Sequence, residues 1–510
     1  MRASKLVALV LGPAMMVAWL LAPPLPGMLD VVREHGVSLL SLKLSLGVLF
    51  WVSVWWISEV VPLAVTALLP VLLLPMAGVI TWKSSLTSFA SGIIWVFIGG
   101  FTLAKAFRVW GLDKRVALKL ASLYRGGSPA LTTFFVACLP VFLLTITGSI
   151  TASTSLVYPI VLSFLSSMGF LSDERYRGYS EATMLSLGQA ATAGAMFLLI
   201  STPPNLVAKS VIEESVPGVT LTFFDWFIVG TPQAIAGLLI SWLAVFAVLR
   251  PKCGALAISD EFIASELRRL GRLRRGEKLV MATFAVALVL WSLPGLVMIA
   301  SNVDPSLAPL SELVSRALPE AAPAVIVVLL LTLMRAEGRP LLTWRELEEG
   351  IDWGVVFLMG GGIALGRGLS ASGFPQWIST LLLRYVAWRP GLWSICALSA
   401  LIGFLVTYPA SNTASSIIAC PLAAYISMSY GYNPIPAVVA AGLACSISSA
   451  LPSTTPPMAI IYGSRCIRLW NMFKVGMVSD TIRLAFLVLT APHLSLLLCQ
   501  VKGVPLRLGP

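Results

Sequence analysis

Hydrophobic runs long enough to cross a lipid bilayer recur along the whole chain of 510 residues, and they constrain its fold more than any other feature. A bilayer core takes about 20 apolar residues per helix. The runs lie at 6–25, 38–57, 61–79, 89–110, 129–170, 181–212, 222–249, 279–300, 322–335, 351–372, 391–430, 434–462 and 479–500. Only 11% of the residues are charged, against roughly 25% in a soluble domain. We therefore predict an all-α polytopic membrane protein.

Two of these runs, 129–170 and 391–430, are about twice too long for one crossing and have polar residues at their midpoints. Such a run is typical of a re-entrant hairpin, in which two short helices enter and leave by the same face and their tip lies at membrane depth. With these two runs as hairpins, about 11 transmembrane helices remain. The run 6–25 is long and lacks a clear cleavage site, so we interpret it as a retained first helix rather than a signal peptide.

Basic residues predict the orientation of the chain. Eight Lys or Arg residues lie in the polar stretch 250–278, and the chain as a whole has a formal net charge of +12. Cytoplasmic loops are enriched in Lys and Arg, so membrane topology explains this charge without a nucleic-acid partner. We expect a cytoplasmic N-terminus, a basic cytoplasmic loop at 250–278, an external C-terminus and a location in a plasma membrane of the prokaryotic type.

Three features occur twice in the same order. "GGFTLAKAFRVWGL" (99–112) matches "GGIALGRGLSASGF" (361–374), and "SITASTSLVYP" (149–159) matches "SNTASSIIACP" (411–421), both 262 residues apart. "STPPN" (201–205) falls on "TTPPM" (454–458) at a slightly different spacing. An odd number of crossings separates the copies, so the two halves are predicted to be inverted repeats, which are common in secondary transporters.

The repeated motifs carry the polar chemistry. Two consecutive prolines break a helix and free backbone carbonyls, which membrane proteins tolerate only beside protein or a watery cavity. Carbonyl and hydroxyl oxygens suit a hard cation, whereas the positive ends of half-helices suit an anion. Ser411, Asn412 and Thr413 add hydroxyl and amide donors without a full charge. The alternative is that they only join helices, but their duplication beside a broken helix favours a binding site.

On these motifs the chain resembles the divalent anion:sodium symporter family, the carriers of succinate, malate, citrate and related anions. "WWISEVVPLAVTALLPVLLLPMAGV" (55–79) is similar to the start of that family, and "STPPN", "SNT" and the "GG" helices are similar to its duplicated motifs. The resemblance implies a homodimer in which a fixed scaffold holds the partner subunit and an elevator-type transport domain carries small dicarboxylates with sodium ions.

The resemblance also implies the site residues. The substrate-binding set is Ser149, Thr151, Thr202, Ser411, Asn412, Thr413 and Pro456. The sodium-binding set is Thr145, Ser149, Ser201, Thr407, Asn412 and Thr454. This sequence departs from the family twice, because Ile150 and Met458 stand where the family has Asn. Since Ile150 offers no oxygen to the first cation site, we expect sodium coupling to be weak or incomplete.

The same reasoning divides the chain into segments. Scaffold helices and the start of the first repeat occupy 1–128, and 279–390 is the corresponding part of the second. The transport domain comprises 129–221 and 391–478, each a re-entrant hairpin followed by a broken helix. The helix at 222–249 closes the first repeat, the basic loop follows at 250–278, and the last helix and the C-terminus take 479–510.

Alternative functions remain open at this point. An anion exchanger, or a proton-coupled or sulfate-type carrier of the same fold, fits the same motifs. An intramembrane enzyme is disfavoured because the two histidines are solitary and no "HExxH" is present. A channel does not need two inverted hairpins. The seven cysteines are dispersed and favour neither a disulfide framework nor a metal site, and no organic cofactor is expected.

Overall fold

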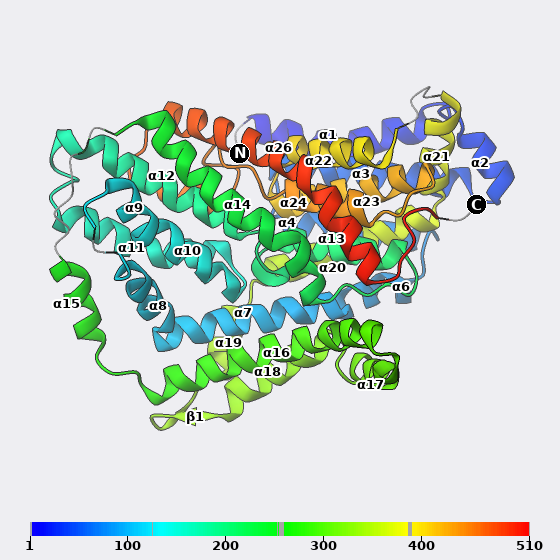
Figure 1. Cartoon of the computed structure of the whole chain (residues 1–510). Helices are drawn as coiled ribbons and strands as arrows, with labels where there is room; N and C mark the ends of the chain where they lie inside the picture. Colours follow the sequence, from blue (N-terminus) through cyan, green and yellow to red (C-terminus); the bar gives the residue numbers. More distant parts are fainter. Residues whose placement is uncertain (1–2, 125, 252, 254–259, 386–389, 509–510) are drawn as a thin grey trace.

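A computed structural model describes residues 3–124, 126–251, 253, 260–385 and 390–508. This part of the chain is mostly helical, and its long helices run roughly parallel across the molecule (Figure 1). Large apolar side chains are exposed on them, including Leu243, Val289 and Leu489. Apolar side chains on the outside of long helices are placed to face lipid, as expected for a polytopic membrane protein.

The elements alternate between long helices and short connecting ones. In the first half they are α1 (Ala3–Leu21), α2 (Met28–His35), α3 (Leu39–Ser58), α4 (Leu63–Thr66), α5 (Leu68–Met76), α6 (Trp82–Leu86), η1 (Thr87–Ala90), α7 (Gly92–Trp110), α8 (Leu112–Ala121), α9 (Pro129–Thr133), η2 (Phe134–Cys138), α10 (Leu139–Leu144), η3 (Thr145–Thr147), α11 (Ile150–Ser167), η4 (Glu174–Tyr176), α12 (Arg177–Gly194), η5 (Leu199–Ser201), α13 (Pro203–Ser215) and α14 (Phe223–Leu249).

In the second half they are α15 (Asp260–Leu270), α16 (Arg275–Val303), η6 (Pro305–Leu307), α17 (Ala308–Ala317), α18 (Ala321–Leu333), β1 (Arg335–Ala336), β2 (Arg339–Pro340), α19 (Trp344–Gly350), α20 (Trp353–Ala371), α21 (Phe374–Tyr385), α22 (Leu392–Thr407), α23 (Asn412–Ser429), α24 (Ile435–Ala444), α25 (Pro456–Tyr462) and α26 (Leu469–Val501). The two strands form one antiparallel hairpin that pairs Ala336 with Arg339.

The count of eleven transmembrane helices stays a prediction. In the described residues eight helices are long and apolar enough to span a membrane, or nine if the bent pair 305–333 is one span. Two of the eight, 129–147 and 150–167, are the halves of the first predicted hairpin. Shorter apolar helical segments are Lys5–Leu21 within α1, the helices α22 and α24, and the pair α4–α5, and the predicted broken helices are each divided in two.

Several helices were not expected from the sequence. They are short and lie outside the predicted hydrophobic runs: α2, α8, α15, α17, α19 and α21. In the predicted basic loop 250–278, residues 252 and 254–259 lie outside the described part, α15 occupies 260–270 and α16 begins at Arg275. The hydrophobic helix predicted at 279–300 is therefore longer than expected at its start.

Connecting segments gather at two ends of the long helices (Figure 1). At one end, here called the α8 end, Arg115 of α8 pairs with Glu277 at 2.7 Å and Lys114 pairs with Glu266 of α15 at 2.9 Å. At the other, the α21 end, Trp377 of α21 donates to the carbonyl of Pro26 at 3.0 Å. Ion pairs also join Arg384 of α21 to two acids of α2, Asp30 and Glu34, at 2.9 and 3.1 Å. The described contacts at each end therefore tie together segments far apart in sequence.

Candidate functional site

The first predicted hairpin turns at Gly148 and Ser149, between η3 and α11. Gly148 has φ = 101°, a left-handed conformation that favours glycine. Ser149 then caps α11, and its Oγ accepts a hydrogen bond from the N–H of Ala152 at 3.1 Å. The hydroxyl of Ser153 donates to the carbonyl of Ser149 at 2.8 Å. A polar tip therefore lies at the start of α11.

The second predicted hairpin, α22 and α23, has the same local arrangement 262 residues later. Ser411 caps α23 and accepts from the N–H of Ala414 at 3.3 Å. The hydroxyl of Ser415 donates to the carbonyl of Ser411 at 2.9 Å. The repeated sequence thus forms the same cap at both tips.

The two proline pairs also begin helices in the same way. Thr202 precedes Pro203 with φ = −156° and ψ = 150°, and Thr455 precedes Pro456 with φ = −147° and ψ = 150°. Proline is well suited to the first position of a helix because that N–H has no partner there. The chain therefore passes from irregular backbone into α13 and α25 at equivalent points, after α12 and α24 have ended.

A cavity of about 390 Å³ joins the two tips and the two breaks. Its volume lies within the range of roughly 300–1,000 Å³ usual for small-molecule sites. It is lined by Pro62, Leu63, Ala64, Phe101, Gly148, Ser149, Ile150, Thr151, Ser201, Thr202, Pro203, Asp352, Gly354, Val355, Leu358, Ser411, Asn412, Thr413, Thr454 and Pro456. Nine of the predicted site residues are therefore brought together from four separate segments of the chain.

The four helices that follow the two tips and the two breaks begin at this cavity, namely α11, α13, α23 and α25, and the starts of α4 and α20 also line it. The N-terminus of a helix carries roughly half a positive charge, and its first N–H groups lack partners within the helix. Among the residues lining the cavity, Asp352 is the one with a formal charge, and no Lys or Arg is present. The electrostatics of these helix ends therefore favour an anion.

Thr407 and Thr145, the remaining predicted ligands, are fully buried and are not among the residues lining the cavity. The Oγ1 of Thr407 lies 2.8 Å from the Oδ1 of Asn412 and 2.7 Å from the carbonyl of Cys445. Ser448 Oγ lies 3.2 Å from the same Oδ1. We call Thr407, Asn412, Cys445 and Ser448 the oxygen cluster. Its hydroxyl, amide and carbonyl oxygens are the ligand types that a hard cation such as sodium takes.

The first tip offers fewer oxygens. Thr145 Oγ1 lies 2.7 Å from the carbonyl of Phe142 and 3.0 Å from that of Gly194. Ser201 Oγ accepts from the N–H of Leu198 at 3.2 Å. Ile150 occupies the position equivalent to Asn412, and its side chain is buried and apolar. The residues at the first tip therefore fit a cation less well than the oxygen cluster does.

Asn205 and Met458 occupy equivalent positions at the two breaks, but only Asn205 has a side-chain amide that can donate hydrogen bonds there. The amide of Asn205 donates to the carbonyls of Ala195 and Leu198, both at 2.8 Å, and so satisfies carbonyls freed by the first break. Met458, at the equivalent place in the second break, is fully buried and has no amide to donate. Asn205 thus braces the first break from within, and Met458 lacks the group to do so in the second.

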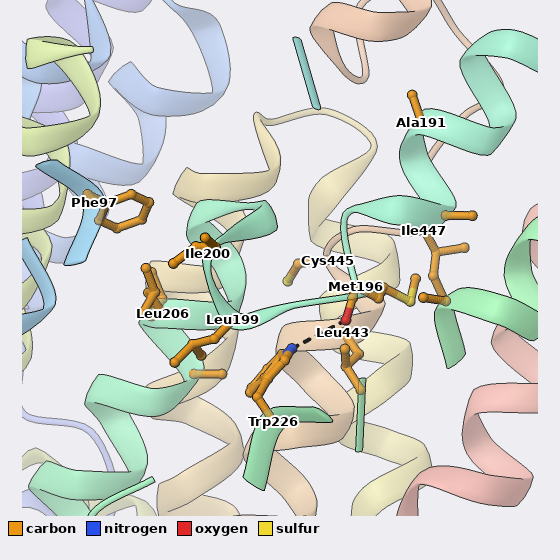
Figure 2. Packing of buried hydrophobic residues seen from close by; sticks show 14 of the residues in the cluster. Phe97, Ala191, Met196, Leu199, Ile200, Leu206, Trp226, Leu443, Cys445 and Ile447 are labelled. Atoms are coloured by element: carbon orange, nitrogen blue, oxygen red, sulfur yellow. Dashed lines mark hydrogen bonds between the residues drawn. The ribbon is translucent and has the colours of Figure 1, made fainter. Parts of the chain in front are cut away.

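The neighbouring long helix α14 supports the first break as well. Trp226 donates its indole N–H to the carbonyl of Met196 at 3.3 Å (Figure 2). Figure 2 also shows Leu443 near the end of α24, and Cys445 and Ile447 of the second break, which belong to the same buried cluster as Met196. Residues of both breaks therefore lie in the buried core.

Sequence reasoning missed several residues of the cavity wall. Asp352 caps α20 by accepting from the N–H of Val355 at 3.2 Å, and Phe101 follows the glycine pair of α7. Pro62, Leu63 and Ala64 come from the start of α4. Their segments were predicted as scaffold helices, but nothing in the local sequence indicates which of their residues face the cavity.

A polytopic helical protein with anion-favouring helix ends around one cavity is a membrane transporter in class. The family model described as the sodium:sulfate symporter transmembrane region matches residues 5–500. The chain belongs to this family, the divalent anion:sodium symporters, and it is a transporter and not an enzyme. The resemblance noted in the sequence is confirmed.

Curated relatives cover nearly the whole chain. A sodium-dependent dicarboxylate transporter, SdcS, of Staphylococcus aureus is 30% identical over 93% of this chain and 88% of its own length. The protein of the same name in Staphylococcus saprophyticus is 29% identical over 95% and 90%.

Two solved structures are more distantly similar. A Neisseria gonorrhoeae MtrF structure has a TM-score of 0.49 and 16% identity, covering 84% of this chain and 85% of its own. The YdaH transporter of Alcanivorax borkumensis has a TM-score of 0.46 and 13% identity, covering 85% and 89%.

Proposed function

We propose that this protein is a secondary transporter of C4-type dicarboxylates that takes sodium as co-transported cargo. The observation that carries the proposal is the meeting of the N-termini of α11, α13, α23 and α25, the helices after the tips and breaks, at a cavity that no Lys or Arg lines. Four half-charges of the helix ends offset roughly two negative charges, the charge of a dicarboxylate. Without a full positive charge in the wall, the anion can also be released, which a carrier requires.

The predicted residues take distinct roles in this proposal. Ser149 and Thr151 at the first tip, and Ser411, Asn412 and Thr413 at the second, donate hydrogen bonds to the two carboxylates. The backbone at Thr202 and Pro456 completes the wall. Sodium would be held at the second tip by the oxygen cluster with Thr454, and at the first, more weakly, by Thr145, Ser149 and Ser201. The names of the Staphylococcus relatives support both dicarboxylate and sodium as cargo.

We further propose that 129–221 and 391–478 form a transport domain that moves against the rest of the chain as an elevator. Two cavities along the scaffold helix α20 support this. The first, described above, lies at its start, and a second of about 250 Å³ lies further along and contacts α13 and α23. Between scaffold and transport segments, a Cβ at Gly362 would lie 2.8 Å from Ile417, so the helices approach closely there.

The inverted repeat and the membrane orientation belong to the same proposal. The equivalent caps of α11 and α23, and of α13 and α25, support the repeat. The basic residues Lys114 and Arg115 lie at the α8 end and pair with Glu266 and Glu277 of the predicted cytoplasmic segment 250–278. The C-terminal segment instead joins the α21 end, where the amide of Asn433 donates to the carbonyl of Pro505 at 3.0 Å. We therefore assign the α8 end to the cytoplasm. We also propose a homodimer, which the family resemblance implies.

The proposal is tested by reconstituting the purified protein in liposomes and measuring uptake of labelled succinate with and without a sodium gradient. Sodium-stimulated uptake that unlabelled C4 dicarboxylates compete away is the expected result. Failure of any dicarboxylate to be transported or to compete under any ionic condition overturns it.

A second candidate is an exchanger or a sulfate-type carrier of the same fold, favoured specifically by Ile150 and by the sulfate in the family's description. Sodium-free liposomes loaded with unlabelled dicarboxylate or sulfate separate these alternatives. Uptake that requires an internal anion and ignores sodium identifies an exchanger, and uptake of sulfate in preference to succinate identifies a sulfate carrier.

A further inference from the structure

Two charged side chains lie buried in α26 beside the second break. Asp480 is 0% exposed and Arg483 is 3% exposed, and their nearest charged atoms are 3.7 Å apart. Burying two charges inside a membrane helix is costly even when they are paired. Neither residue is among those lining the substrate cavity. The cost of burying these two charges therefore indicates that they have a role other than contact with the substrate.

Asp480 contacts two residues that directly follow members of the oxygen cluster in the sequence. Its carboxylate accepts from the hydroxyl of Tyr408 at 2.8 Å. It also accepts from the N–H and the Oγ of Ser449, at 2.7 and 2.6 Å. Tyr408 follows Thr407, and Ser449 follows Ser448, so one carboxylate fixes both the hairpin tip and the break that supply the cluster's oxygens. Hydrogen bonds to a charged acceptor are about twice as strong as neutral ones.

Arg483 links the same region to the first half of the chain. Its guanidinium donates to the Oγ1 and the carbonyl of Thr192, at 3.1 and 3.3 Å, near the end of α12. It also lies 3.4 Å from the carbonyl of Ile447 in the second break. Arg483 therefore spans the two broken helices while it holds Asp480 in place.

The first break shows what is missing from the second. There, Asn205 braces the freed carbonyls from within, and Trp226 of the following long helix α14 holds the carbonyl of Met196. Ser201 and Thr454 occupy equivalent positions in the repeated motif, 253 residues apart. By the same offset, Met196 corresponds to Ser449, and Asn205 corresponds to Met458. At the second break the following long helix is α26, and its Asp480 holds Ser449, while Met458 gives no amide.

We infer that Asp480 and Arg483 are a positioning pair for the second cation site, and that they replace the amide brace which Met458 cannot supply. The pair fixes Tyr408 and Ser449, and thereby the spacing between Thr407 and Ser448. This inference rests on the proposed function, since it assigns sodium to the oxygen cluster.

The test measures sodium binding by thermal stabilisation of the purified protein, alongside sodium-dependent uptake in liposomes. Asp480→Asn keeps the shape of the side chain but removes its charge. We expect the half-saturating sodium concentration to rise about tenfold or more, as for the loss of a hydrogen bond to a charged group. The maximal uptake rate at saturating sodium is expected to stay within about threefold, since no substrate contact is lost.

Matched variants separate positioning from a general loss of stability. Ser479→Ala removes two neighbouring buried contacts of α26, to Gln189 of α12 at 3.1 Å and to Ser241 of α14 at 3.0 Å. Neither partner belongs to the tip or the second break, so this variant should leave sodium affinity unchanged. Met458→Asn, added to Asp480→Asn, supplies the missing brace and should recover much of the sodium affinity. If Asp480→Asn does not fold, Tyr408→Phe removes a single donor and should raise the sodium requirement about threefold.

The possible results are distinct. A folded Asp480→Asn protein with the sodium affinity of the parent overturns the inference, as does a Met458→Asn addition without recovery. Where only Tyr408→Phe can be studied, an unchanged sodium requirement overturns it. If the parent itself shows neither sodium nor succinate stabilisation, the proposed function fails and this inference with it.

Discussion

Lys209 of α13 is fully buried and forms an ion pair with the half-buried Glu320 at the start of α18, with 2.9 Å between its Nζ and a carboxylate oxygen. Lys209 belongs to the proposed transport domain and Glu320 to the proposed scaffold. The lysine also contacts Glu213 of its own helix and donates to the carbonyl of Leu221 at 2.7 Å. An elevator movement must separate Lys209 from Glu320 in every cycle while its other two contacts travel with it.

Glu320→Gln is therefore expected to change the rate of the conformational step and not the binding of substrate. Lys209 keeps Glu213 as a counter-ion, so the variant should fold. Because the conformation with the pair closed loses stabilisation, we expect the maximal transport rate to rise about threefold, with the KM for succinate within about twofold. Initial uptake rates in liposomes over a range of succinate concentrations measure both.

The matched control is Glu349→Gln. Glu349 pairs with Lys105 at 3.5 Å, and both residues lie in the proposed scaffold. This variant should leave both parameters unchanged. A Glu320→Gln protein whose KM changes while its maximal rate does not would contradict the assignment of the pair to a moving interface.

Asn412→Ala is expected to abolish binding of both succinate and sodium while the protein still folds. The amide is part of the cavity wall, and its Oδ1 lies within hydrogen-bond distance of Thr407 and Ser448. Losing it removes a donor for the anion and an oxygen for the cation together. Thermal stabilisation by each ligand tests this, with Ser479→Ala as a control, and retention of the parent's affinity for both ligands would show that the site is elsewhere.

Ile150→Asn is expected to strengthen sodium dependence. Ile150 opens α11 as Asn412 opens α23, but it supplies no oxygen. An amide there would add one hard ligand to Thr145 and Ser201, so we expect a lower half-saturating sodium concentration and a steeper activation curve. Uptake measured across sodium concentrations checks both. Steep, cooperative activation in the unmodified protein would instead mean that the first site is complete without this amide.

Surface labelling tests the proposed orientation. Arg345 of α19 is exposed at the α8 end, and Glu312 of α17 is exposed at the α21 end. A cysteine at 312 should react with an impermeant maleimide in intact cells, whereas a cysteine at 345 should react only after the membrane is opened. Five of the seven native cysteines are buried, so the background from the parent should be low. The opposite pattern reverses the topology.

The sequence predicts those parts of the site whose signals are local. A serine before a helix caps it, and a proline pair ends one helix and starts the next, so Ser149, Ser411 and the breaks at Thr202 and Thr455 could be found from their motifs. That these segments meet at one cavity was implied by the family resemblance. The short helices were not predicted because they lack a hydrophobic run of membrane-spanning length. For example, α17 has only ten residues, and three of its last six side chains are polar.

Residues brought to the site only by packing could not be predicted in this way. Asp480 and Arg483 are separated from the second tip by about 70 residues, and nothing in the local pattern of α26 indicates that they face Tyr408 and Ser449. Asp352 reaches the cavity because α20 packs against α4 and η1, which the sequence does not specify.

Asp352 supplies the last prediction, because a carboxylate in the wall of an anion site opposes the binding of its own ligand. Among the residues that line the cavity, Asp352 is the one that carries a formal charge. It lies on the proposed scaffold and not on the moving segments. Its charge therefore acts on the anion only in conformations that bring the tips beside the start of α20, where it favours release. Asp352→Asn keeps an N-cap for α20 through the side-chain oxygen that now accepts from Val355.

We expect this variant to bind succinate about two- to fivefold more tightly, the effect of losing one repulsive charge near a solvated site. Sulfate or another dianion should gain similarly, whereas a monoanion should gain less, since the repulsion scales with ligand charge. Binding measured by thermal stabilisation at low and high salt tests this, because screening should shrink the difference. An unchanged affinity for dianions at low salt would mean that Asp352 does not act on the bound anion.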